Sequence, residues 1–143
     1  MHHGRVNDSC LFCEIAGGRI AAARVYEDED FVAFLDHRPL FAGHTLVVPR
    51  VHYGTLMDLP PVGTGPLFEL VRRMCTAVEK AAAAEGTFVA VNNRVSQSVP
   101  HLHVHVVPRR PKDGLKGFFW PRTKYRDEGE MESMRAAIAE ALG

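Results

Sequence analysis

Short apolar runs separated by polar turns dominate the first part of the chain. β-prone residues fill Arg24–Glu27 and Phe31–Leu35, and the acidic residues 28–30 between them predict a hairpin. A β-branched run at residues 44–49 follows Gly43 and is stopped by a proline. These runs predict neighbouring strands of a sheet.

A helical period replaces the strand pattern between about residues 66 and 85. Apolar residues recur there at helical spacing, and Gly86 is expected to end the helix. The apolar stripe consists of Leu67, Leu70, Val71, Met74, Val78 and Ala81. Cys75 lies beside this stripe, where a small buried core residue is favoured over a reactive thiol.

Two more strands and a second helix complete the pattern. Residues 87–92 and 101–107 predict strands that pair antiparallel across a short polar connection. From about Glu128 a second helix is expected, and its inward face consists of Met131, Met134, Ile138 and Leu142. The order β-β-β-α-β-β-α indicates an α+β fold, in which helices are attached to an antiparallel sheet.

Length and composition fit one folded domain. The 143 residues are 46% hydrophobic and 24% charged, close to the globular average. No apolar run reaches the roughly 18 residues typical of a membrane span, and no secretion signal is expected. The cysteine count of three is odd, which argues for a reducing compartment, so a cytoplasmic protein is expected.

Charge is balanced overall but uneven along the chain. The net charge of zero gives no reason to expect nucleic acid or an anionic membrane as a partner. Residues 109–126, however, carry seven Lys or Arg residues against Asp113 alone. This segment is either a solvated loop or a contact for a phosphorylated ligand or partner.

Histidine alternates with aliphatic residues over residues 101–107. In a strand, His101, His103 and His105 share one face while the aliphatic residues between them face the core. With eight histidines in the chain, the chance expectation for this spacing is roughly 0.02. Imidazole can be a nucleophile, a proton donor or a metal ligand, and the spacing alone assigns none of these roles.

Cys10 and Cys13 form a second cluster of reactive residue types. Two thiolates at this spacing supply half of a tetrahedral zinc site, and His52 and one of the strand histidines are candidates for the other half. A thioredoxin-like redox pair is the alternative. Such a pair is expected in a βαβ unit, which the predicted order lacks.

Four stretches form an ordered set of motifs. They are the Cys-x-x-Cys stretch at 10–15, Phe-Leu-Asp-His-Arg-Pro at 34–39, the Gly-His strand with its following histidine at 43–52, and the Gln-Ser and histidine stretch at 97–108. Together, over about residues 8–111, they closely resemble the histidine triad (HIT) superfamily of nucleotide hydrolases and transferases. The resemblance implies an antiparallel five-stranded sheet with one long central helix and a C-terminal helix.

The resemblance also implies how the chain is organised. Residues 1–108 are expected to form the core domain with an N-terminal zinc-binding segment. Residues 109–143, a basic aromatic tail and the C-terminal helix, are expected to belong to the same domain. Relatives of this size are commonly two-fold homodimers, so a homodimer is expected.

A reaction at the α-phosphorus of a nucleotide follows from the same resemblance. In the family the middle histidine, here His103, attacks phosphorus and forms a covalent nucleotidyl-histidine that water or another acceptor resolves. His105 is expected to bind the phosphate oxygens. Gln97 and Ser98 match positions that hydrogen-bond the bridging atom or the leaving group, and Ser98 can relay a proton to it.

The matching positions also imply a nucleoside pocket. Asp36 resembles the carboxylate that accepts the ribose hydroxyls, Asn92 matches a phosphate-side contact, and His44 is expected to buttress the phosphate pocket. The positions that enclose the nucleoside are Leu11, Phe12, Ile15, Phe34, Leu35 and His37. Ordinary core packing explains the apolar members equally well.

Family members that keep the cysteine pair bind structural zinc. The corresponding ligands here are Cys10, Cys13, His52 and His101. A closed shell of four protein ligands leaves no open position for catalysis. The zinc would tie the N-terminal segment to the catalytic strand.

Two features depart from the family pattern. The connection from Asn92 to Gln97 is about two residues shorter than in many relatives and lacks the glycine often found before the glutamine, which alters the phosphate side. The aromatic triplet Phe118, Phe119 and Trp120 lies outside the common core. It is suited either to stacking on the second base of a dinucleoside polyphosphate or to a dimer interface.

The expected function is hydrolysis at a nucleoside 5'-α-phosphate, with a phosphoramidate or a dinucleoside polyphosphate as substrate and a purine as the favoured base. A nucleotidyltransferase or phosphorylase is the nearest alternative, although its usual members are longer. A zinc-stabilised nucleotide-binding module that recognises a partner is another. The complete set of triad histidines with the Gln-Ser pair favours the hydrolase.

Overall fold

The computed structural model describes residues 10–115 and 121–143. The aromatic triplet Phe118, Phe119 and Trp120 lies outside these residues. The elements are α1 (Leu11–Ala16), β1 (Arg24–Glu27), β2 (Phe31–Leu35), β3 (Thr45–Pro49), the 3-10 helix η1 (Leu56–Asp58), α2 (Pro61–Ala82), β4 (Gly86–Ala90), β5 (Val104–Arg109) and α3 (Glu128–Leu142). The chain divides into two compact units, one ending at Asp113 and the other beginning at Gly114.

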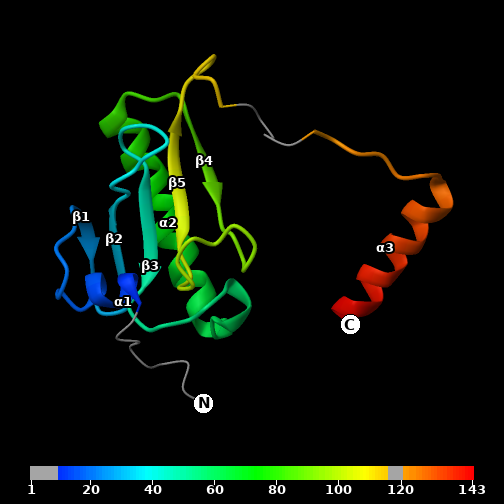
Figure 1. The fold of residues 1–143 in the computed structure, drawn as a ribbon, viewed down its shortest axis with the longest axis horizontal. Helices are drawn as coiled ribbons and strands as arrows, with labels where there is room; N and C mark the ends of the chain where they lie inside the picture. Colours follow the sequence, from blue (N-terminus) through cyan, green and yellow to red (C-terminus); the bar gives the residue numbers. More distant parts are fainter. Residues whose placement is uncertain (1–9, 116–120) are drawn as a thin grey trace. The chain divides into compact units, whose positions relative to one another are not determined.

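The first unit is built on a five-stranded antiparallel sheet with the order β1-β2-β3-β5-β4 (Figure 1). The expected hairpin of β1 and β2 is present. In its turn, the Asp28 carboxylate accepts hydrogen bonds from the backbone N–H groups of Asp30 and Phe31, both at 2.8 Å. The predicted α+β class and the five-stranded antiparallel sheet are confirmed.

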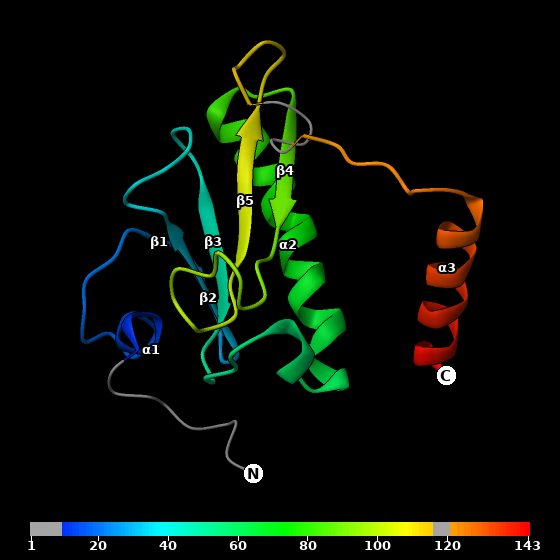
Figure 2. The same cartoon turned by 45° about the vertical axis from the view of Figure 1, so that its right-hand side comes forward.

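Both faces of the sheet are covered. The core on the α2 face includes Phe31, Ala33, Val47, Leu102, Val104 and Val106, and the core on the α1 face includes Val32, Phe34, Leu46 and Val48. This alternation follows from the two-residue period of a strand. Figure 2 shows α1 and α2 on opposite sides of the sheet. Because Val104 and Val106 point toward α2, His105 between them belongs to the α1 face.

The central helix α2 begins and ends earlier than the sequence predicts. The predicted start near residue 66 is wrong because Pro61 takes the first helical position, where a missing N–H is tolerated, and Pro66 lies inside the helix. The predicted stop at Gly86 is wrong because Ala83, with φ of 52°, already caps the helix in the left-handed region. The buried stripe is confirmed at Leu67, Leu70, Val71, Met74 and Val78, whereas Ala81 is exposed.

The histidine strand begins later than predicted. His101 and His103 precede β5, so only His105 of the three pairs in the ladder, opposite Leu46 and Ala90. Tertiary backbone bonds hold the preceding segment, since the Leu102 N–H donates to the Tyr53 carbonyl at 2.7 Å. The strand also continues through Pro108, which pairs with Thr87 of β4. The β3 pairing has already ended there, and a proline is tolerated on such a one-sided stretch.

The second unit contains α3, which begins at Glu128 as predicted. The Asp127 side chain caps it by accepting the Glu130 N–H at 2.8 Å. Within this unit the predicted inward face is not buried, because Met131, Met134, Ile138 and Leu142 are exposed. This unit contributes a single described helix, which has no facing element of its own to bury that stripe against. None of the helices in the described ranges combines the length and the apolarity needed to cross a membrane.

Candidate active site and metal centre

Four potential metal ligands from three parts of the chain meet at the start of α1. The Cys10 Sγ lies 3.3 Å from Nδ1 of His101, and the Cys13 Sγ lies 3.3 Å from Nδ1 of His52 and 3.5 Å from Nδ1 of His101. All four ligand atoms lie within 4.8 Å of one another, and three of the residues are buried. Cys10 caps α1, with its Sγ accepting the Cys13 N–H at 3.4 Å.

The donor set and its spacing fit zinc. Two thiols and two imidazoles form a common structural zinc shell. Bond lengths of about 2.3 Å to sulfur and 2.0–2.1 Å to nitrogen, at tetrahedral angles, would separate sulfur from nitrogen by about 3.6 Å. The observed separations of 3.3–3.5 Å are close to this value. The cluster can therefore hold a tetrahedral metal ion with only small adjustments.

The His101 ring is oriented for ligation through Nδ1. Its Nε2–H donates to the Pro49 carbonyl at 2.8 Å, which leaves the Nδ1 lone pair directed at the cysteines. Burial lowers the pKa of His101 to about 4, so the ring is neutral at pH 7. A neutral imidazole with one nitrogen hydrogen-bonded to a carbonyl is the usual form of a histidine ligand.

The ring of His103 is oriented by a hydrogen bond to the backbone rather than by the cysteines. Its Nδ1 donates to the His101 carbonyl at 2.7 Å, which leaves the lone pair on Nε2. Burial lowers its pKa, so the ring is in its neutral, nucleophilic form at neutral pH. Phe12 of α1 packs edge-on against the ring, with centroids 5.0 Å apart, and fixes its orientation.

A hydrogen-bond chain defines the protonation of His105. The Leu40 N–H donates to Nδ1 of His44 at 3.1 Å, so the neutral His44 ring carries its proton on Nε2. That Nε2 lies 3.0 Å from Nδ1 of His105 and 3.7 Å from an Asp36 carboxylate oxygen. His105 therefore accepts at Nδ1 and keeps a proton on Nε2. Burial, reinforced by His103 and His44, lowers the pKa of His105 to about 4.

A pocket of about 600 Å³ lies on the α1 face of the sheet beside these rings. Most of the residues expected to enclose a nucleoside line this pocket: Leu11, Phe12, Ile15, Phe34, Leu35, Asp36 and His37. Ser98, His103 and His105 line it as well. Its mostly apolar wall and few polar groups are typical of a small-molecule site. These residues come from α1, from β2 and the two residues after it, from β5 and from the loop before β5.

Other lining residues were missed by sequence reasoning. They are the residues 20–23 before β1, together with Leu46 and Val99. The alternation of β3 could have found Leu46, since it shares the α1 face of the sheet with Phe34. Residues 20–23 carry no pattern that predicts a pocket wall.

Residues 18–112, more than half of the chain, match the HIT domain family model. The chain belongs to the HIT family. Among solved structures, a protein of Streptococcus mutans, SMU.412c, superposes with a TM-score of 0.84 at 34% identity and covers 98% of this chain and 88% of its own. A zinc-bound histidine triad family protein from Mycobacterium smegmatis superposes with a TM-score of 0.72 at 39% identity, over 94% of this chain and 96% of that protein.

Some curated relatives have a named activity. Adenylylsulfatase HINT3 of Arabidopsis thaliana is 33% identical over 112 residues, which is 77% of this chain and 57% of the plant protein. The adenosine 5'-monophosphoramidase hnt1 of Schizosaccharomyces pombe is 34% identical over 115 residues, which is 79% of this chain and 84% of the yeast protein. The relatives of this HIT chain therefore include a nucleotide hydrolase. The S. mutans structure also shares the fold predicted from the motifs.

Three predicted residues lie outside the pocket lining of this HIT chain. They are Asn92, Gln97 and His44. Gln97 is held by backbone groups: its Nε2 donates to the Gly54 carbonyl at 2.7 Å, and its Oε1 accepts the Arg94 N–H at 2.9 Å. His44 lies behind His105, as a buttress would.

The short connection before Gln97 has an unusual backbone. Arg94 and Ser96 adopt φ values of 71° and 63°, in the left-handed region that favours glycine. The Asn92 Nδ2 donates to the Ser96 carbonyl at 3.2 Å and so closes this turn. The shortened connection is therefore a tight turn that ties Asn92 and Gln97 to the backbone.

Proposed function

We propose that this HIT protein hydrolyses a nucleotide at its 5'-α-phosphate through a covalent nucleotidyl-His103, with a purine nucleoside phosphoramidate or dinucleoside polyphosphate as substrate. One observation carries the proposal. His103 lines the pocket, and its hydrogen bond to the His101 carbonyl leaves the Nε2 lone pair for attack. The named activity of the yeast relative supports the phosphoramidate as the first substrate to test.

The reaction divides into two displacements. In the first, Nε2 of His103 bonds to the α-phosphorus as the bond from phosphorus to the leaving nitrogen or oxygen breaks, and the leaving atom takes a proton from the Ser98 hydroxyl or from water. In the second, water attacks phosphorus and the bond between phosphorus and Nε2 of His103 breaks. The proton of water returns to Ser98 where Ser98 gave the first proton, and otherwise passes to solvent. The neutral His103 is regenerated, and the product is a nucleoside monophosphate.

Neighbouring groups are suited to support these steps. The Nε2–H of His105, kept in place by His44, donates to a phosphate oxygen. Asp36, which lines the pocket, accepts the ribose hydroxyls. Charge that develops on phosphorus-bound oxygens is thereby stabilised by a donor whose tautomer is already set.

The cluster of Cys10, Cys13, His52 and His101 would hold a structural zinc ion. Its four ligands complete the coordination shell, so the metal would order α1 and the segment before β5 rather than act on substrate. We also propose a cytoplasmic homodimer and the tail, residues 109–143, as part of the same functional domain. The exposed α3 face is consistent with a need for a partner surface.

Turnover of adenosine 5'-phosphoramidate by the purified protein tests the proposal. Formation of AMP and ammonia is the expected result, and a quenched reaction should contain protein heavier by one adenylyl group. Turnover only when phosphate or a sugar phosphate is added would indicate a phosphorylase or transferase. Nucleotide binding with no turnover of phosphoramidate or dinucleoside polyphosphate would overturn the hydrolase and favour a binding module.

A further inference from the structure

Helix α1 forms one wall of the pocket, yet it is only six residues long. A helix this short is not stable by itself, so tertiary contacts must fix its position. At its N-terminal end, the Cys10 Sγ contacts Nδ1 of His101 and the Cys13 Sγ contacts Nδ1 of His52, both at 3.3 Å. At the opposite end, the carbonyl groups of the last turn have no partners within the helix. The Ile15 carbonyl accepts a backbone hydrogen bond from the Gly18 N–H at 3.0 Å, and side chains can add further donors to this turn.

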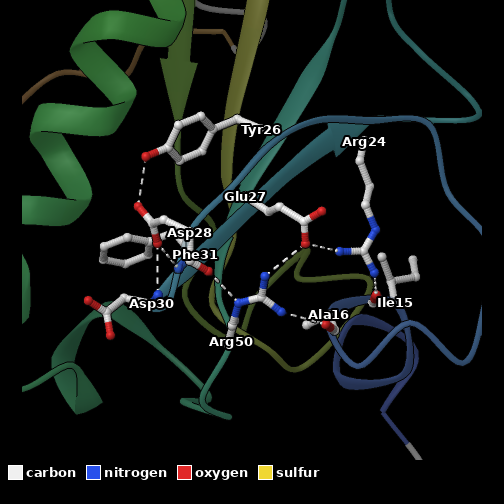
Figure 3. A network of polar contacts seen from close by, with 9 residues as sticks. All are labelled: Ile15, Ala16, Arg24, Tyr26, Glu27, Asp28, Asp30, Phe31 and Arg50. Atoms are coloured by element: carbon white, nitrogen blue, oxygen red, sulfur yellow. Dashed lines mark hydrogen bonds and ion pairs between the residues drawn. The ribbon is translucent and has the colours of Figure 1, made fainter.

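Arg24 of β1 and Arg50, which directly follows β3, donate further hydrogen bonds to this turn (Figure 3). The Arg50 Nη1 donates to the Ala16 carbonyl at 2.8 Å, and the Arg24 Nη2 donates to the Ile15 carbonyl. Both residues also bond Glu27, whose Oε1 accepts from Arg24 Nη1 at 2.8 Å and from Arg50 Nη2 at 2.9 Å. The end of α1 is thereby tied to β1 and to the end of β3.

The positive charges of Arg24 and Arg50 lie at the C-terminal end of α1. The C-terminal end of a helix carries a partial negative charge, which a guanidinium stabilises. The shared Glu27 carboxylate offsets part of the repulsion between the two arginines. The Arg24 and Arg50 side chains are 25% and 30% exposed, so water screens these contacts only partly.

All three nitrogen atoms of the Arg50 guanidinium group donate hydrogen bonds. Besides its bonds to Ala16 and Glu27, its Nε donates to the Asp28 carbonyl at 2.6 Å. Three acceptors in three directions match the planar guanidinium, and a lysine ammonium on a flexible stem cannot reproduce that arrangement. Arg50 therefore holds the end of α1 at a fixed position relative to the β1–β2 turn.

We infer that Arg24 and Arg50 are positioning residues for nucleoside binding, because they fix the last turn of α1 and with it the pocket wall formed by Ile15. This role rests on the proposed function. The contact of α1 with the triad lies nearer the other end, where Phe12 packs on His103 beside the cysteines. Loss of the arginine contacts should therefore weaken recognition of the base more than attack on phosphorus.

The experiment compares two ligands that differ in the base. AMP reaches the whole pocket, whereas ribose 5-phosphate keeps the phosphate and ribose and lacks the base. In Arg50→Met, the Kd for AMP is expected to rise about tenfold, with the Kd for ribose 5-phosphate and kcat changed less than about twofold. Arg50→Lys is expected to behave nearly like Arg50→Met, because it keeps the charge and loses the fork.

A matched control separates this role from general stability. Arg72→Met removes an arginine that also pairs through both branches with one carboxylate, Glu69 on the exposed surface of α2, at 3.0 and 2.7 Å. It should leave both Kd values unchanged. If Arg50→Met does not fold, Arg24→Met, which removes the bond to Ile15, takes its place.

The outcomes distinguish the two proposals. An unchanged Kd for AMP, or an equal loss for both ligands, would overturn the positioning role. If the wild-type protein binds AMP but turns over no nucleotide, the hydrolase fails and the positioning role is still decided by the Kd values. A wild-type protein that binds no nucleotide at all would overturn both.

Discussion

The Nδ1 atom of His103 lies 2.7 Å from the backbone carbonyl oxygen of His101. This single bond joins the candidate nucleophile to a candidate metal ligand two residues away. It fixes the tautomer of His103 and directs the Nε2 lone pair away from the backbone. The same residue, His101, therefore contributes its ring to the cysteine cluster and its carbonyl to the orientation of His103.

Replacement of His103 by Ala should abolish turnover while nucleotide binding survives. The covalent step loses its nucleophile, but the apolar pocket wall and Asp36 remain. A fall in kcat of at least roughly 10³-fold is expected, as is typical for loss of a covalent nucleophile. Steady-state kinetics and mass spectrometry of quenched reactions provide the measurement. A near-normal kcat, or an adenylyl group found on another residue, would contradict the assignment.

The metal cluster predicts one zinc ion per chain and a stability that depends on it. Chelation, or Cys13→Ser, should lower the melting temperature on the order of 10 °C, because the metal binds only the folded arrangement of four ligands. Cys75→Ser is the control, since Cys75 is a half-buried residue of α2 and lies outside the cluster. Metal analysis and thermal unfolding measure both effects. A Cys10–Cys13 disulfide in freshly purified protein would contradict the prediction.

Local patterns predicted the sheet, whereas the resemblance to the HIT family predicted most of the residues that line the pocket. The alternation in β2 and β3 and the helical stripe of α2 are short-range signals, and the structure buries most of these residues, with Ala81 of the stripe exposed. Contacts distant in sequence could not be predicted in the same way. The Tyr53 carbonyl that holds Leu102 and the Gly54 carbonyl that holds Gln97 lie more than 40 residues from their partners. Those contacts decide where β5 begins and where Gln97 points.

The low pKa of His105 predicts a specific loss of stability in acid. Burial holds this pKa at about 4 in the folded protein, against an ordinary value of 6.5. Between these values the unfolded chain binds a proton that the folded protein does not, so the free energy of unfolding falls as the pH decreases from 6.5 to about 4. Below about pH 4 the loss of free energy of unfolding is complete, and above pH 6.5 there is none.

Replacement of His105 by Asn should reduce this dependence. Removal of one such group lowers the slope of the free energy of unfolding against pH by at most about 1.4 kcal/mol per pH unit. Burial also lowers the pKa values of His44 and His103, so a residual slope is expected. Urea denaturation at several pH values gives the slopes. Identical slopes for the two proteins would show that His105 is not kept neutral by the fold.

The left-handed turn before Gln97 predicts a stabilising substitution. Ser96 has a φ of 63°, where a side chain costs roughly 1–2 kcal/mol. Glycine removes that cost but adds roughly 0.5–1 kcal/mol of unfolded-state entropy. The side chain of Ser96 is exposed, and the turn is closed through its backbone carbonyl by Asn92, so Ser96→Gly loses no described contact of the turn. The free energy of unfolding should therefore rise by about 0.5–1 kcal/mol.

Ser98→Gly is the matched control for this turn. Ser98 is also exposed, but it is not among the described residues with positive φ, so glycine brings only the entropy cost and should lower the free energy of unfolding by about 0.5–1 kcal/mol. The same Ser→Gly substitution should therefore raise the free energy of unfolding at position 96 and lower it at position 98. Chemical denaturation of both variants measures the difference. A loss of stability in Ser96→Gly equal to that in Ser98→Gly would show that the short connection does not adopt the left-handed turn.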